Sequence, residues 1–152
     1  MRRPRKTRGP GASDKACGET MSEPSSFWQR RRVQSFHEMR GELRLFFEQR
    51  GIRAAVSDDL ILATQEACNN ACQHGTDRAG CDVVVACLQD TVVIEVADRG
   101  HGFDLEAVRA TWPPELMRGD GRGLFLIAEL TDQIEVVRRR RGTLVRIIKL
   151  VR

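Results

Sequence analysis

The stretch CDVVVACLQDTVVIEVAD, residues 81–98, contains two runs rich in valine and isoleucine that are separated by Gln89 and Asp90. β-Branched residues favour extended backbone, and two such runs with a short polar break between them are typical of a β-hairpin. We therefore predict two adjacent core strands joined by a turn at Gln89 and Asp90. The segments on either side of this hairpin determine the fold class.

Two helices and one strand are predicted before the hairpin. Residues 34–50 place apolar side chains at helical spacing and are followed by a glycine. A second helix is expected to begin at Ser57, a favourable N-cap residue, and to run to about His74, before Gly75. Residues 27–33 are expected to form a first strand.

After the hairpin, residues 104–120 contain a short helical piece and then a loop rich in proline and glycine. Such a long loop is usually functional or mobile. Residues 124–132 are expected to form a helix, and residues 133–151 a second hairpin that turns near Arg141 and Gly142. Helices grouped between hairpins favour an α+β fold, here a two-layer α/β sandwich with a mixed, mostly antiparallel sheet and helices on one face.

The chain length of 152 residues fits one domain with a single core. The first 20 residues hold six of the 25 basic and two of the 21 acidic groups, which leaves 19 of each in the remaining 132 residues. Because these cancel, direct nucleic-acid binding is not expected. We assign residues 1–25 to a disordered basic tail and residues 26–152 to the domain. The tail either contacts an acidic partner or precedes the true translation start at Met21.

The composition also indicates in which cellular compartment the protein is expected. No run of residues reaches the ~18 apolar positions that a membrane span requires, and the opening segment has no apolar signal-peptide core. Five cysteines without a secretory signal fit a reducing compartment, in which thiols serve as small hydrophobic side chains. We therefore expect a soluble, cytoplasmic protein that does not bind membranes.

The second predicted helix carries two interleaved patterns over residues 66–74. At about 100° per residue, Glu66, Asn70 and His74 share one narrow stripe of the helix surface. Asn70 can offer a carbonyl oxygen to Mg²⁺, and Glu66 can accept a proton from an attacking hydroxyl. The alternative is that these residues lie on a solvated face and bind nothing.

The cysteines of the same helix point away from that stripe. Cys68 and Cys72 lie beside an isoleucine and are expected to pack against the first helix. A zinc site is the alternative, but a structural zinc ion needs about four converging ligands, and His74 lies on another side of the helix. Cys81 and Cys87 share one face of a predicted strand, and the sequence does not place them near Cys68.

Three glycine motifs follow, each at the end of an element where a ligand can approach the backbone. DRGHGF, residues 98–103, ends a strand with a carboxylate that can accept a hydrogen bond from an exocyclic amine such as that of adenine. GDGRGLF, residues 119–125, places glycines before a helix, where free N–H groups and the helix dipole favour phosphate. Gly142 and Thr143 start the last strand, where a hydroxyl can support the base contact.

These motifs, together with Glu66-x-x-x-Asn70-x-x-x-His74, resemble those of the Bergerat-fold ATPases shared by gyrase, Hsp90, histidine kinases and MutL. The resemblance covers about residues 27–150. Within that superfamily the compact layout is similar to the anti-sigma-factor serine/threonine-protein kinases of Gram-positive bacteria. The cofactors implied by the resemblance are ATP and Mg²⁺, and the lid it implies is the segment 104–120.

The resemblance also implies roles for individual residues. Glu66 would be the catalytic base, Asn70 would hold Mg²⁺ and Asp98 would bind adenine, whereas His101 and Arg122 occupy variable motif positions where a phosphate contact is possible. The candidate nucleotide-binding residues are Asn70, His74, Asp98, Gly100, Gly102, Phe103, Gly121, Arg122, Gly123, Leu124 and Thr143.

The function implied by the resemblance is regulation of transcription. A protein of this kind binds a sigma factor, phosphorylates a serine on a small STAS-domain anti-anti-sigma antagonist, or does both, and it forms a homodimer through its first helix and strand. The alternative is a regulator in which ATP orders the lid and switches partner affinity without phosphoryl transfer. A fragment of a gyrase- or MutL-type ATPase is disfavoured because the sequence shows no transducer domain.

Two other patterns look functional but have simpler interpretations. FHEMRGEL, residues 36–43, is similar to the phosphoacceptor box of sensor histidine kinases, but His37 lies only 29 residues before Glu66, too few for the intervening dimerisation domain. We therefore interpret His37 as a helix-surface residue. The run RRRR, residues 138–141, is interpreted as a solvated hairpin end, with an acidic partner surface as the alternative.

Overall fold

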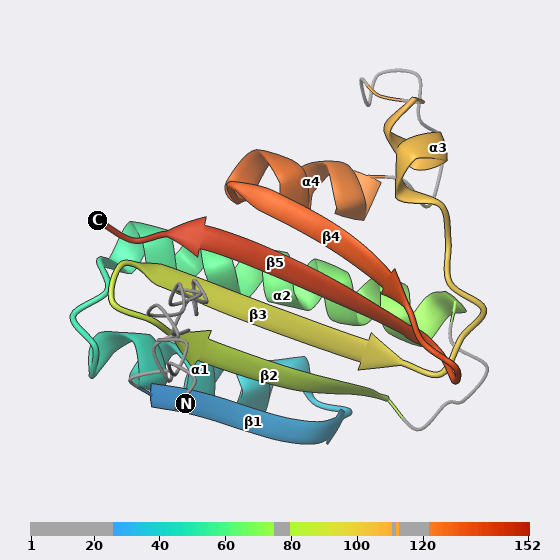
Figure 1. Cartoon of the computed structure of the whole chain (residues 1–152). Coiled ribbons are helices and arrows are strands. Elements are labelled where there is room, and N and C mark those ends of the chain that lie inside the picture. The colour runs from blue at the N-terminus through green and yellow to red at the C-terminus, as the bar shows by residue number, and fades with distance from the viewer. Residues whose placement is uncertain (1–25, 75–79, 111, 113–121) are drawn as a thin grey trace, which may run out of the picture.

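The computed structural model describes residues 26–74, 80–110, 112 and 122–152. A five-stranded sheet forms one layer, with α1 and α2 behind it in the view of Figure 1 and α4 packed beside α2. The predicted tail and most of the loop between α3 and α4 lie outside the described residues. In chain order the elements are β1 (Ser26–Val33), α1 (Phe36–Glu48), α2 (Ala54–His74), β2 (Cys81–Cys87), β3 (Thr91–Asp98), α3 (Leu105–Arg109), α4 (Arg122–Leu130), β4 (Gln133–Arg138) and β5 (Thr143–Leu150).

The strand order of the sheet is β1-β2-β3-β5-β4, and every neighbouring pair is antiparallel. The predicted hairpin of residues 81–98 joins β2 to β3, with Val85 opposite Ile94. The second predicted hairpin joins β4 to β5, and β5 lies between β3 and β4. The predicted α+β two-layer sandwich is therefore confirmed, but the described strands pair only in antiparallel fashion, whereas a mixed sheet was expected.

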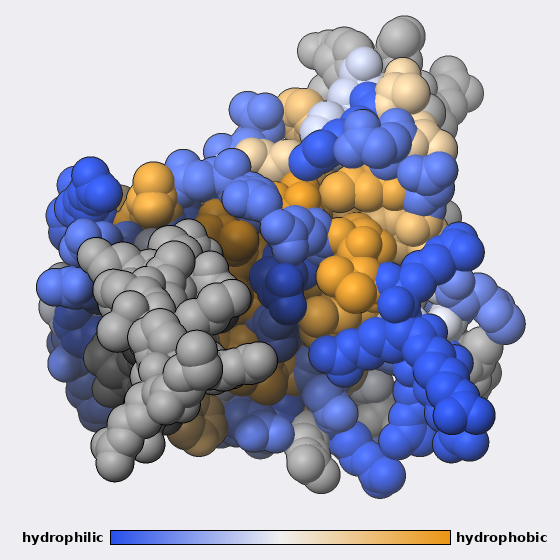
Figure 2. Space-filling view, viewed as in Figure 1, coloured by the Kyte–Doolittle hydropathy of each residue, from blue (hydrophilic) through white to orange (hydrophobic). Residues whose placement is uncertain are grey.

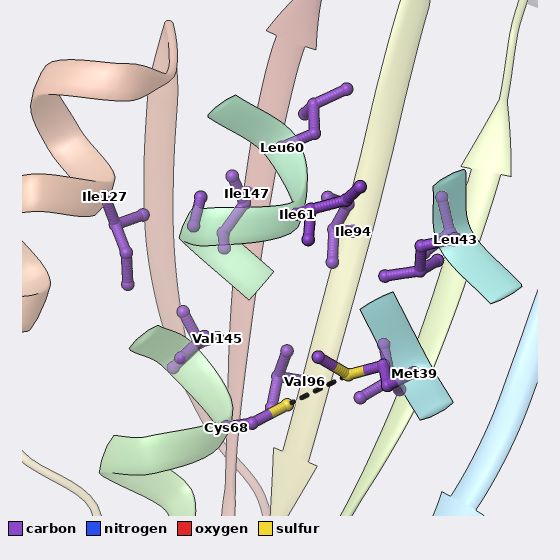
Figure 3. Packing of buried hydrophobic residues seen from close by; sticks show 14 of the residues in the cluster. Met39, Leu43, Leu60, Ile61, Cys68, Ile94, Val96, Ile127, Val145 and Ile147 are labelled. Carbon is purple, nitrogen blue, oxygen red and sulfur yellow. Dashed lines mark hydrogen bonds between the residues drawn. The ribbon is translucent and has the colours of Figure 1, made fainter. Parts of the chain in front are cut away.

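The core fills the space between the sheet and the helical layer. Alternate residues of β2 and β3 are buried, which is the period expected of a strand with one face on the core. Met39 and Leu43 of α1 and Leu60 of α2 have no exposed surface. In Figure 3 these side chains and those of Ile94 and Ile147 project from the two layers into the same space. Apolar burial therefore joins the helices to the sheet.

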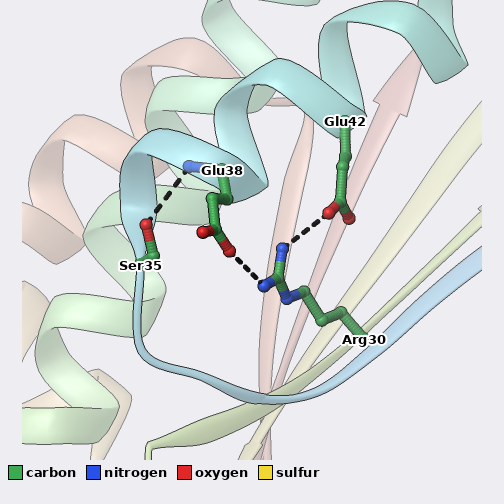
Figure 4. A network of polar contacts seen from close by, with 4 residues as sticks. All are labelled: Arg30, Ser35, Glu38 and Glu42. Carbon is green, nitrogen blue, oxygen red and sulfur yellow. Dashed lines mark hydrogen bonds and ion pairs between the residues drawn. The ribbon is translucent and has the colours of Figure 1, made fainter.

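A network of ion pairs also connects β1 to α1 (Figure 4). Arg30 donates to Glu38 at 2.6 Å and to Glu42 at 2.7 Å, and the Ser35 hydroxyl accepts a hydrogen bond from the Glu38 amide. Both carboxylates are largely exposed, with 60% and 48% of their side-chain surface accessible. Exposed ion pairs contribute little to stability. The apolar core therefore holds α1 against the sheet, and the ion pairs help to orient it.

The structure corrects the predicted starts of three helices, and α4 (Arg122–Leu130) begins two residues before the predicted range 124–132. α1 begins at Phe36 rather than residue 34, because Ser35 has extended backbone and caps the helix. α2 begins at Ala54 rather than Ser57, since the Ser57 amide already donates to the Arg53 carbonyl at 2.9 Å. Ser57 is buried inside the helix and does not cap it. The first strand, predicted over residues 27–33, is confirmed as β1.

The opposite face of the sheet carries no helix in the described part of the chain. Figure 2 shows apolar patches on this face, bordered by hydrophilic side chains. Arg146 of β5 pairs with Glu95 of β3 at 2.9 Å and with Glu135 of β4 at 3.2 Å, which links three neighbouring strands. Among the described helices, none combines the length and apolar character that crossing a membrane demands.

Candidate functional site

A cavity of about 180 Å³ lies where the last turns of α2 meet the end of β3, the start of β5 and the segment leading into α3. Its polar lining comes from both layers, because Asn70 and His74 belong to α2 and Asp98 ends β3. The predicted helix stripe and the predicted strand-end motif therefore meet at one place. The lining residues are Asn70, Ala71, His74, Asp98, Gly102, Phe103, Val108, Leu124 and Val145.

Asn70 provides the first indication of a ligand. It is only 9% exposed, and its side-chain Nδ2 has no hydrogen-bond partner among the described residues. Leaving a buried polar group unpaired costs about 1–3 kcal/mol, so a partner beyond the described residues is expected, and a ligand in the cavity can supply it. The burial of Asn70 also contradicts the alternative of a solvated helix face; His74, by contrast, is exposed at the cavity edge.

Glu66 and Asn70 face the first turn of α4. A Cβ added at Gly123 would lie 3.1 Å from Glu66 Oε2 and 3.4 Å from both polar atoms of the Asn70 amide. A larger residue at position 123 would therefore crowd both side chains. The arrangement brings a carboxylate, a carboxamide and the amino end of a nine-residue helix together.

The sheet side of the cavity is built from the DRGHGF motif and the start of β5. The Gly100 amide donates to Asp98 Oδ1 at 2.6 Å, which fixes the orientation of that carboxylate. Gly102 has a φ of +77°, and a Cβ there would lie 2.8 Å from the Thr143 hydroxyl. Thr143 is fully buried, and its Oγ1 has no partner among the described residues. It is the second unpaired polar group beside the cavity.

Some predicted residues lie away from the lining. His101 and Arg122 are exposed and are not part of it. Gly121 falls outside the described residues, as do residues 111 and 113–120 of the predicted lid. The described part of that lid contains α3.

Sequence reasoning missed three apolar lining residues, Ala71, Val108 and Val145. Val145 could have been found, because it lies two positions after Thr143 and therefore on the same face of β5. Ala71 directly follows Asn70 on α2, but a small apolar residue inside a helix gives no signal of a ligand. No pattern in the sequence indicated that Val108 of α3 reaches the cavity.

The structure revises the interpretation of the cysteines. Cys68 is buried with its Sγ 4.0 Å from Met39 Sδ of α1, which confirms packing against the first helix, but Cys72 is exposed. Cys81 lies beside Cys68, which the sequence did not indicate; their hydrogen bond raises the pKa of the Cys68 thiol and lowers the pKa of the Cys81 thiol. Within the described residues, no group of three or more His, Cys, Asp or Glu side chains is arranged to hold a metal ion.

The fold and these motifs define a family. The sequence model of the histidine kinase-like ATPase domain matches residues 30–149, so the chain belongs to the histidine kinase-like ATPase domain family. This confirms the resemblance on which the expectations above rest.

More specific relatives are serine-protein kinases named RsbW. The protein from Oceanobacillus iheyensis is 33% identical over 89 residues, which are 52% of this chain and 56% of the relative. The one from Bacillus pumilus is 37% identical over 92 residues, again 52% of this chain and 56% of the relative. The chain therefore matches the curated relatives over about half of their length.

A solved structure shares the fold. A chain in the crystal structure of the SiaB–SiaC complex from Pseudomonas aeruginosa superposes with a TM-score of 0.59 at 16% identity. The match covers 82% of this chain and 89% of that one. At this identity the likeness supports the α+β architecture alone.

Proposed function

We propose that the protein is an ATP-dependent serine/threonine-protein kinase of the anti-sigma-factor type. The observation that carries the proposal is the buried, unpaired Asn70 Nδ2 in a cavity lining that also contains Asp98, together with the buried, unpaired Thr143 Oγ1 next to the lining residue Gly102. Two buried polar groups without partners, one in the lining and one beside it, are costly without a ligand. A nucleotide supplies polar groups for both layers of the site.

The base of the nucleotide fits the sheet side. Asp98 would accept from the exocyclic amine of adenine, and the Thr143 hydroxyl would complete the contact to the ring. A volume of about 180 Å³ is below the ~300–1,000 Å³ typical of whole small-molecule sites. The cavity therefore holds the base, and the rest of the nucleotide extends along α2.

The phosphates fit the helical side. The amino end of α4 offers free N–H groups and the positive end of a helix dipole, next to Asn70 and Glu66. Asn70 would hold Mg²⁺ through its Oδ1, because Mg²⁺ prefers oxygen ligands and would neutralise developing charge when bound, and its unpaired Nδ2 would donate to a phosphate oxygen. Glu66 would accept the proton of the attacking serine hydroxyl.

The proposed partners rest on the resemblance to anti-sigma-factor kinases. The RsbW relatives are named serine-protein kinases, which supports a protein substrate. We therefore propose a STAS-domain antagonist as substrate and a sigma factor as the bound target, in the cytoplasm, with control of transcription as the outcome. A homodimer through α1 and β1 is supported by the exposed apolar side chains of Leu45 and Phe27 on these two elements.

The test of the proposed function is a transfer assay with labelled Mg-ATP and the STAS-domain proteins encoded in the same genome. We expect label on one of them, and we expect Asn70→Ala to lose transfer because the Mg²⁺ ligand is missing. Asn69→Ala, on the same helix but outside the cavity lining, is the matched control and should retain transfer. ATP binding without transfer to any STAS protein would instead support the nucleotide-switched regulator, and no ATP binding would refute both.

Thr143→Val tests the adenine end separately. We expect ATP affinity to fall about tenfold, equivalent to about 1.4 kcal/mol for one lost hydrogen bond. The unliganded protein should not lose stability, because valine has the same shape and removes an unpaired buried group. Titration followed by the fluorescence of Trp112, which packs edge-on against Phe125 of α4 at 5.3 Å, measures the affinity.

The matched control for this variant is Thr131→Val. Thr131 is also buried, but its hydroxyl already donates to the Ile127 carbonyl at 2.6 Å. This control should lose about 1 kcal/mol of stability and keep its ATP affinity. If the two variants behave alike, the Thr143 hydroxyl has no role in binding.

A further inference from the structure

β4 lies at the edge of the sheet and has one side without a partner strand (Figure 1). Among the described strands it pairs with β5 alone. The Arg139 amide donates to the Gly142 carbonyl at 2.9 Å and closes the β4–β5 hairpin. Because hydrogen-bonded and non-hydrogen-bonded pairs alternate in an antiparallel ladder, the backbone groups of every second residue before Arg139 are directed away from β5. These residues are Arg138, Val136 and Ile134.

The same three residues line a groove. It has a volume of about 590 Å³ and lies between β4 and the segment that leads into and forms α3. Its apolar lining consists of Phe103, Leu105, Ile134 and Val136. The outward backbone groups of β4 therefore lie beside a surface that can receive side chains, which is the arrangement used to bind an extended peptide by strand addition.

The acidic side chains in the groove already have partners within the chain. Asp104 accepts hydrogen bonds from two backbone amides in the first turn of α3 and caps that helix. Glu106 pairs with Arg109 at 3.0 Å, and Glu135 of β4 pairs with Arg146 at 3.2 Å. The negative charges of the groove are therefore balanced before a ligand arrives.

The arginines at the end of the groove are not balanced in this way. Arg138 is exposed and forms no ion pair with a described residue, and the same holds for the arginines of the following turn, residues 139–141. This end of the groove therefore complements an acidic side chain. The first 20 residues of the chain itself carry six basic and two acidic groups and do not match this charge.

We propose that β4 and this groove dock an extended segment of the protein substrate that carries an acidic side chain. The segment adds a sixth strand to the sheet, because its backbone bonds to the outward groups of β4. Its apolar side chains lie against Phe103 and Leu105, and its acidic side chain pairs with Arg138. The inference rests on the proposed function for the identity of the substrate, a STAS-domain protein.

The groove adjoins the nucleotide cavity without being part of it. Phe103 lines both, and a Cβ added at the cavity residue Gly102 would lie 3.7 Å from Arg138 Nε. The docked segment therefore holds the substrate next to the site of transfer and takes no part in the chemistry. Losing this contact should raise the KM for the protein substrate and leave kcat nearly unchanged.

The test follows amide hydrogen exchange of the full chain, residue by residue, alone and with each STAS-domain protein encoded in the same genome. One of these proteins should slow exchange at Val136 and Arg138 at least about tenfold, because an amide that is hydrogen-bonded to an added strand is protected. The amides of Glu135 and Val137 face β5 in the same ladder. They should be protected in both samples and serve as the reference.

A charge-reversal pair tests the acidic contact. Arg138→Glu should weaken binding of that STAS protein about tenfold, because it replaces attraction by repulsion in the groove. Arg140→Glu makes the same change of charge at an exposed turn residue that does not line the groove. This control should weaken binding by less than about threefold, the part due to long-range charge.

A second pair tests the backbone contact. Val136→Pro removes an amide that faces away from β5, and proline is tolerated at such edge positions. This variant should fold and lose the docking interaction. Val136→Ile keeps the amide and an apolar side chain, so it should dock as the unmodified protein does.

Three results would overturn the inference. The first is unchanged exchange at Val136 and Arg138 with every STAS protein. The second is equal binding by the Arg138→Glu and Arg140→Glu variants. The third is protection that appears without a partner and grows with protein concentration, which would assign the edge of β4 to a second copy of the chain. If a STAS protein protects these amides but ATP is not bound, the proposed function fails and the docking site stands.

Discussion

Glu66→Gln should abolish most phosphoryl transfer while leaving ATP binding nearly unchanged. Glutamine has the shape of glutamate but cannot accept the serine proton, and removing a general base typically costs about 10²–10⁴-fold in rate. Glu66 is not part of the cavity lining, so the proposed contacts of Asp98 and Thr143 with the adenine ring should persist in this variant. The transfer rate in a single turnover and the ATP affinity from tryptophan fluorescence separate the two effects.

Glu129→Gln is the matched control for this experiment. Glu129 lies on α4 and is exposed. Its replacement by glutamine removes the same negative charge from the protein. It should transfer phosphate at the rate of the unmodified protein. A Glu66→Gln variant that transfers within about threefold of this control would show that another group accepts the proton. Loss of ATP binding in the same variant would show that Glu66 serves binding instead.

The parts of the fold that could be predicted depend on residue patterns within one short segment of the chain. The hairpin of residues 81–98 could be predicted because β-branched runs and a polar break act locally. The start of α2 could not be placed, because Ser57 is a good cap residue in isolation but is buried inside the helix in the protein. Tertiary packing outweighed the local capping preference there.

The candidate site was predictable to a similar extent. Helical spacing placed Asn70 and His74 on one stripe, and strand-end glycines marked Asp98 and Gly102; all four line the cavity. The contact between Cys81 and Cys68 could not be predicted, because it depends on how β2 lies under α2. Spacing within one element is readable from sequence, whereas contact between two elements needs the register in which they pack.

Gly142→Ala should be the most destabilising single substitution at the site, because the backbone there accommodates no side chain. Gly142 has a φ of +100°, and a Cβ would overlap the Asp98 carbonyl oxygen and lie 2.6 Å from the Arg99 Cα. Both neighbours are backbone atoms, so a rotamer change cannot relieve the overlap. We expect a loss of about 3–5 kcal/mol of unfolding free energy, the range of backbone strain combined with displaced packing. ATP affinity should fall as well, because Asp98 must move.

Two other glycines make this prediction specific. Gly51 has a φ of +68° with no atom near its Cβ position, so Gly51→Ala should cost only about 1–2 kcal/mol, the strain of the left-handed conformation. Gly41 lies inside α1 with open space around it, so Gly41→Ala should stabilise the protein by about 0.5–1 kcal/mol. Urea unfolding of the three variants gives the order directly. If Gly142→Ala unfolds at the same urea concentration as Gly51→Ala, the close approach of β5 to Asp98 does not constrain the site.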